Sequence, residues 1–224
     1  GADQYVPDGP VSTRAGTIRP GSLDLPAAQR RRMSYSLNEF QALARKAARG
    51  SGVPWGIAEE AGMAARYLCE HGLNGAGSLC QALGQPPKTN PLYIGPALSD
   101  GAWAQQNWQS SQPMHAPALL IPFAALSLAD TDIWLHIAWD GVSLYLSKSD
   151  LIYTKIDQIH AAGPIEVKIE TGEAGLGKTL QKSSRAQISK ECYRALEQLA
   201  EKTYAPATEA SRLAGAGAGL NDND

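Results

Sequence analysis

Apolar residues recur every three to four positions in several stretches of the chain, a spacing that places them on one face of a helix. The first stretch opens with the capping-box pattern of Ser36 and Glu39, and Gly50 stands where the C-terminal cap of a helix would. In the second stretch, Pro54 suits the first position of a helix and Gly72 its end. Together these patterns predict helices at residues 36–50, 54–72, 78–83 and 189–203.

Alternating apolar and polar residues predict a sheet in the middle of the chain. The strongest pattern is the pair IWLHIAW and VSLYL, which Asp140 and Gly141 separate. An Asp-Gly pair favours the type I′ turn of a two-residue hairpin, so we expect two antiparallel strands here. The apolar runs at 118–126 and 151–153 and the alternation at 165–170 are expected to add further strands.

The order of these elements predicts the fold class. Helices first, strands in the middle and a helix last, without βαβ alternation, indicate an α+β fold with a mostly antiparallel central sheet. Residues 1–32 are rich in Gly, Pro and Arg, so we expect a disordered extension, with Met33 as the natural start of the protein. Residues 33–204 are expected to form one α+β domain, followed by a glycine-rich tail at 205–224.

Composition limits the classes of partner. The chain has 43% hydrophobic and 19% charged residues, and its net charge of −2 provides no field that would attract nucleic acid or an anionic membrane. No stretch is long and apolar enough for a membrane span. We therefore expect a cytoplasmic protein with no nucleic-acid or membrane partner. Cys69, Cys80 and Cys192 lack the spacing of a disulfide framework or a zinc site, which predicts reduced thiols.

Residues 172–179, GEAGLGKT, match the phosphate-loop pattern G-x-x-x-x-G-K-T. A working phosphate loop opens directly into a helix whose N-terminal amides hold the phosphates. Here the next helix start is Ser189, and little chain remains after it. A polar turn between a strand and a helix is therefore the preferred interpretation, and nucleotide binding is not.

Two glycine-rich segments offer a candidate site for a small anionic ligand. Glycines let backbone amides approach a ligand closely, and arginine can hold an anion through two parallel hydrogen bonds. The residues expected to bind the ligand are Arg49, Gly52, Trp55, Arg212, Gly215 and Gly217. No metal site is expected; the carboxylates of Asp222 and Asp224 are a weak alternative for a hard cation. A flexible tail is the simpler interpretation of the terminal segment, and the cofactor is left open.

Two other functions compete with ligand binding. In an enzyme, Glu60 would be the general base, because it flanks the apolar stripe of the second helix, where burial would raise its pKa. An ordinary carboxylate paired with Arg or Lys is the simpler interpretation. In an interaction subunit, Trp103 and Trp108 would anchor a protein partner. The simpler interpretation is that they fill the edge of the core in a long loop at 85–117.

The segments SYSLNEFQALARKAARGSGVPWGIAEEAGMAARYL at 34–68 and TYAPATEASRLAGAGAGLNDND at 203–224 resemble a bacterial family, domain of unknown function 3726. The resemblance spans Met33 to Asp224 and implies a single-domain cytoplasmic protein whose terminus is ordered or contacts a ligand. It brings no activity, substrate or cofactor. The first hypothesis is therefore a small-molecule-binding domain or accessory subunit in bacterial catabolism, with its site where residues 49–60 meet the glycine-rich terminus.

Overall fold

Capping interactions start the first helix where the sequence predicts it. The computed structural model describes residues 32–101, 107–157, 159–160 and 163–204, and its helix α1 spans Leu37–Gly50. The Glu39 amide donates to the Ser36 hydroxyl at 3.2 Å, and the Ser36 amide donates to the Glu39 carboxylate at 2.9 Å. These bonds satisfy amides that the helix leaves unpaired, and those from Ser36 lower the pKa of the Glu39 carboxyl.

Replacing Ser36 with alanine is expected to lower the free energy of unfolding by about 1 kcal/mol, because the Glu39 amide loses its acceptor. Urea denaturation at pH 7 measures the effect. Ser51→Ala is the matched control, since the Ser51 hydroxyl only donates to the Ala48 carbonyl at the other end of the same helix. Equal losses in the two variants would contradict the capping role.

The other predicted helices form as well. They are α2 (Trp55–Glu70), α3 (Gly75–Ala82) and α6 (Lys190–Glu201), and the Ser189 hydroxyl caps α6 by accepting a bond from the Cys192 amide. One detail of the prediction is wrong. Gly50 is the last residue of α1, and the turn that follows depends on Gly52, whose φ of 95° favours glycine.

The predicted hairpin is confirmed and lies at the centre of an antiparallel sheet. Its strands are β3 (Trp134–Trp139) and β4 (Val142–Leu146), joined through Gly141 at a φ of 76°. The sheet order is β2-β6-β3-β4-β5-β7, with every neighbouring pair antiparallel. The remaining strands are β2 (Trp108–Gln109), β5 (Leu151–Ile156), β6 (Lys168–Gly172) and β7 (Lys178–Thr179). The α+β class with a mostly antiparallel sheet is therefore confirmed.

The sequence pattern predicts a strand at 118–126, but this apolar run is mostly a helix. A short 3-10 turn, Pro117–Leu119, leads into α5 (Leu120–Leu126). The side chains from Leu120 to Ala124 are all buried, so the segment needs no polar face. A short run that is apolar all round has neither a helical nor a strand period, and the sequence pattern alone could not separate the two.

The long loop predicted at 85–117 also contains a helix. Helix α4 (Pro91–Ser99) begins at Asn90, whose side-chain oxygen accepts a hydrogen bond from the Leu92 amide at 3.0 Å. Its proline-rich sequence conceals the helix, because Pro91 is tolerated in the first turn and Pro96 lies inside. A 3-10 turn, Pro87–Thr89, precedes it.

A two-stranded sheet joins segments from opposite ends of the described chain. Strand β1 (Arg32–Ser36) pairs antiparallel with β8 (Arg185–Ser189), with Arg32 opposite Ser189. Arg32, which the sequence pattern assigns to the extension, is already part of β1. Since α1 follows β1 directly and α6 follows β8 directly, this pairing sets the two helices side by side.

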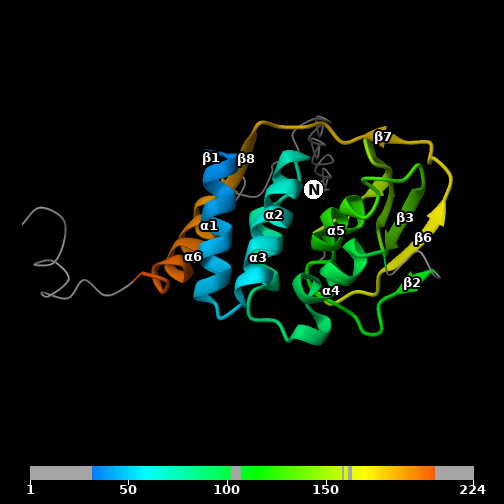
Figure 1. Cartoon of the computed structure of the whole chain (residues 1–224). Coiled ribbons are helices and arrows are strands. Elements are labelled where there is room, and N and C mark those ends of the chain that lie inside the picture. Colours follow the sequence, from blue (N-terminus) through cyan, green and yellow to red (C-terminus); the bar gives the residue numbers. More distant parts are fainter. Residues whose placement is uncertain (1–31, 102–106, 158, 161–162, 205–224) are drawn as a thin grey trace, which may run out of the picture.

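Figure 1 shows helices α1, α2, α3 and α6 grouped on one side, the large sheet on the other, and α4 and α5 between them. The chain returns from β7 to β8 across one end of the molecule (Figure 1). The buried residues of both parts form one hydrophobic cluster, from Phe40 in α1 to Ile137 in β3. None of the helices in the described part of the chain is long and apolar enough to cross a membrane.

Candidate functional site

The phosphate-loop pattern does not form a phosphate site. Its lysine and threonine, Lys178 and Thr179, form β7, so the segment leads into a strand and not into a helix. The expected turn between a strand and a helix is thus corrected to a connection between two strands. The glycines have a packing role: a Cβ atom on Gly175 would collide with the Tyr145 ring, and one on Gly177 with the Tyr153 carbonyl.

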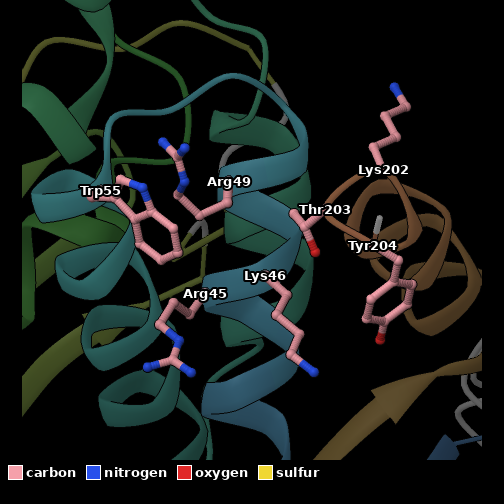
Figure 2. A pocket seen from close by; sticks show the side chains of 7 residues that line it. All are labelled: Arg45, Lys46, Arg49, Trp55, Lys202, Thr203 and Tyr204. Carbon is pink, nitrogen blue, oxygen red and sulfur yellow. The ribbon is translucent and has the colours of Figure 1, made fainter. Parts of the chain in front are cut away.

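The strongest candidate site lies where the last turns of α1, the start of α2 and the end of α6 meet. An open hollow of about 410 Å³ is found there, which we call the cationic hollow. Figure 2 shows its walls, with α1 on one side and the segment after α6 on the other. The lining residues are Arg45, Lys46, Arg49, Trp55, Lys202, Thr203 and Tyr204.

Arg49 is held in a fixed position within the cationic hollow. One guanidinium nitrogen, Nη1, donates a hydrogen bond to the Val53 carbonyl at 2.7 Å. The guanidinium also lies over the Trp55 ring, 4.4 Å from its centroid (Figure 2). The turn at Gly52 brings Val53 and Trp55 back toward Arg49, and these two contacts leave the other guanidinium N–H groups to bind an anion.

The other cations of the hollow are only partly neutralised. Arg45 contacts the Glu59 carboxylate at 3.1 Å, and the Lys46 ammonium lies over the Tyr204 ring, 5.4 Å from its centroid. Within the described ranges, no carboxylate lies at ion-pair distance from Lys46, Arg49 or Lys202. Arg45 and Arg49 are also one helical turn apart, a spacing at which like charges repel. The hollow therefore carries an excess of positive charge.

The structure brings together part of the predicted site. Arg49 and Trp55 line the hollow, and Gly52 forms the turn between them. The predicted positions in the glycine-rich tail lie outside the described residues: Arg212, Gly215, Gly217, Asp222 and Asp224. Sequence reasoning missed four lining residues with chemical interest, namely Arg45, Lys46, Lys202 and Tyr204. The segment RKAAR at 45–49 was a usable signal for the first two.

Glu60, the proposed general base, does not share the cationic hollow. It follows Trp55 by five residues, which turns it about 140° around α2 from that ring. Glu60 instead lines a smaller hollow of about 140 Å³ between α2 and α5, with the apolar side chains of Met63 and Leu126. Burial raises the pKa of Tyr67, in the same hollow, to about 12. Among the described residues, no arginine lines this hollow beside Glu60, and its catalytic role stays a prediction.

The tryptophans of the predicted interaction site do not form a patch that the structure describes. Trp108 is partly buried in β2 and packs against the core, as the simpler interpretation expects. Trp103 lies outside the described residues.

The histidines have structural contacts. In β3, His136 stacks on Tyr145 and bonds the Ser143 hydroxyl at 2.8 Å, away from the hollows above. Across residues 32–101, 107–157, 159–160 and 163–204, no three His, Cys, Asp or Glu side chains are grouped to hold a metal ion.

Comparison with known proteins supports the family assignment. Residues 35–110 match the model of the family described as Protein of unknown function (DUF3726), which confirms the resemblance over this part of the chain. The match includes three cations of the hollow and Trp55, whereas Lys202 and Tyr204 lie beyond it. Searches of curated proteins and of solved structures found no match.

Proposed function

We propose that the protein is a binding domain for a small organic anion, which the cationic hollow holds. The observation that carries this proposal is the group of Arg45, Lys46, Arg49 and Lys202 in one hollow, with Glu59 the one carboxylate that pairs with any of them in the described part of the chain. Such a group repels itself, and a bound anion would relieve that repulsion.

The chemistry of the walls defines the class of ligand. Arg49 can bind a carboxylate or a phosphate through two hydrogen bonds, and its contacts with Val53 and Trp55 reduce the entropy lost on binding. Trp55 is 66% exposed, and its ring offers an apolar surface beside the cations. A volume of about 410 Å³ is in the range of small-ligand pockets. These features favour a carboxylate or phosphate attached to a flat, apolar group.

The wider role follows from this class of ligand. In the described part of the chain, the residues that line the hollow include no carboxylate, histidine or cysteine that could act as a catalytic group. This lining fits an accessory or carrier role in bacterial catabolism better than that of an enzyme. The arrangement of Glu60 in a different hollow supports this choice.

A thermal-shift experiment tests the proposal with defined probes. Benzene-1,2,4-tricarboxylate represents the flat organic anions, inorganic phosphate the compact anions, and benzamide the uncharged flat compounds. A probe at about one hundred times its Kd stabilises the fold by about 2.7 kcal/mol, which raises Tm by several degrees. We expect the tricarboxylate to give the largest shift and benzamide none. A shift with benzamide equal to that of the tricarboxylate would contradict anion binding.

Replacing Arg49 with glutamine is expected to weaken tricarboxylate binding at least tenfold, because charge-assisted hydrogen bonds to the ligand are lost. Arg194→Gln is the matched control: Arg194 lies exposed on α6, outside the hollow, and its replacement changes the net charge equally. Kd values from concentration-dependent Tm shifts provide the measurement. The same loss in both variants would mean that net charge, and not the hollow, attracts the anion.

A further inference from the structure

Two cysteines that are 112 residues apart in sequence lie side by side in the fold. Cys80 is in α3, and Cys192 is in the first turn of α6. The Cys80 Sγ atom lies 4.0 Å from the Cys192 carbonyl oxygen, which brings the Cys80 side chain against the residue that carries the second thiol. Both side chains are partly exposed, whereas the third cysteine, Cys69, is only 3% exposed. All three are free thiols in this structure.

The two thiols have different environments. Cys192 is the third residue of α6, where the positive end of the helix dipole favours a thiolate. The neighbouring Cys80 thiol lowers the pKa of Cys192, although burial and the Glu191 carboxylate oppose this change. The Cys192 thiol and burial raise the pKa of Cys80. Because Cys192 lies in the first turn of a helix and Cys80 near the end of one, we assign Cys192 as the nucleophile and Cys80 as its protonated neighbour.

We propose that Cys80 and Cys192 form a reversible oxidation site that reacts with peroxides and joins α3 to α6 through a disulfide. The Cys192 thiolate attacks one peroxide oxygen, the O–O bond breaks, and Cys192 becomes a sulfenic acid while the leaving oxygen takes up a proton. The Cys80 sulfur then attacks the Cys192 sulfur. The S–S bond forms, the S–O bond breaks, and the hydroxyl departs as water with the Cys80 proton. Two equivalents of a thiol reductant reverse the reaction.

Mass spectrometry of the full chain tests this site. The protein is treated with a small excess of hydrogen peroxide, unfolded in the presence of an alkylating agent and digested without reductant. We expect one peptide pair linked through Cys80 and Cys192, an intact mass lower by two hydrogens, and alkylation of Cys69 alone. Because the disulfide closes a long loop, Tm should rise by roughly 5–15 °C and return on reduction.

Two variants assign the roles. Cys80→Ser should stop the reaction at the sulfenic acid, which dimedone traps on Cys192, while Cys192→Ser should leave Cys80 unmodified at the same peroxide dose. Cys69→Ala is the control that keeps the disulfide. The proposal is overturned if the folded wild-type protein yields no Cys80–Cys192 peptide, or if Cys69 is oxidised as fast as Cys192. The presence or absence of the linked peptide in the wild-type protein tests the proposal even if a variant folds poorly.

Discussion

Replacing Gly50 with alanine is expected to lower the free energy of unfolding by about 3 kcal/mol. A Cβ atom at this position would overlap the carbonyl oxygen of Leu199 in α6. Because the obstacle is backbone, it cannot rotate aside, and α1 and α6 would have to separate. Urea denaturation of the wild type and the variant at pH 7 measures the loss.

Gly56→Ala is the matched control for this substitution. Gly56 is in the first turn of α2, and a Cβ atom there meets nothing within 4 Å. Alanine should leave stability unchanged or raise it by up to about 1 kcal/mol, because it restricts the unfolded chain. Similar losses at Gly50 and Gly56 would contradict the close packing of α1 on α6. Residues of α1 and of the segment after α6 line the cationic hollow, so loss of this packing would also disturb the hollow.

The second large effect is a loss of stability in acid, which depends on His160. The His160 Nε2 atom accepts a hydrogen bond from the Asn74 amide at 3.0 Å, and Nδ1 lies 3.2 Å from the Ser78 hydroxyl. Nε2 must be unprotonated to accept, so the ring is neutral and Nδ1 carries the hydrogen. Burial, with a smaller contribution from the charge of Arg32, lowers the pKa of His160 to about 4.

The sign of the effect follows from this lowered pKa. The unfolded chain binds the proton near pH 6.5, whereas the folded chain binds it only near pH 4. The stabilisation is therefore complete above about pH 6.5 and is lost as the pH falls toward 4, with a total of about 3 kcal/mol. Denaturant unfolding at several pH values measures it. Carboxylates also titrate in this range, so the wild-type curve alone does not isolate His160. A variant that lacks the imidazole separates its contribution.

His160→Gln provides that comparison. The variant should be less stable than the wild type at pH 7, and the difference should shrink as the pH falls from 6.5 to 4, because glutamine binds no proton. His136→Gln is a control outside this contact, since His136 bonds Ser143 in the sheet. A constant difference between the wild type and His160→Gln across this range would contradict the buried, neutral histidine.

The elements that the sequence predicted correctly are those with local signals. The capping pair of Ser36 and Glu39 and the Asp140-Gly141 turn each act within a few residues, and the structure confirms both. The segments that form α4 and α5 were assigned wrongly because prolines obscure one and uniform burial the other. In these two segments, packing against neighbours decides the conformation, and no periodicity of their own reveals it.

The same distinction explains the candidate site. Arg49 and Trp55 flank one turn and could be paired from the sequence alone. Lys202 and Tyr204 reach the hollow only because β1 pairs with β8 and sets α6 beside α1. Cys80 and Cys192 meet for a related reason, since their helices are distant in sequence. A single sequence holds no signal for such long-range pairings.

Isothermal titration calorimetry with benzene-1,2,4-tricarboxylate tests the binding site most directly. We expect one site per chain in the wild type and in Arg194→Gln, with affinity that falls as salt is added. In a double variant, Arg45→Gln with Arg49→Gln, binding should weaken by a factor of about one hundred or disappear, because two charge-assisted contacts are lost. Equal Kd values in all three proteins, or no binding heat in the wild type, would contradict a cationic hollow that holds an organic anion.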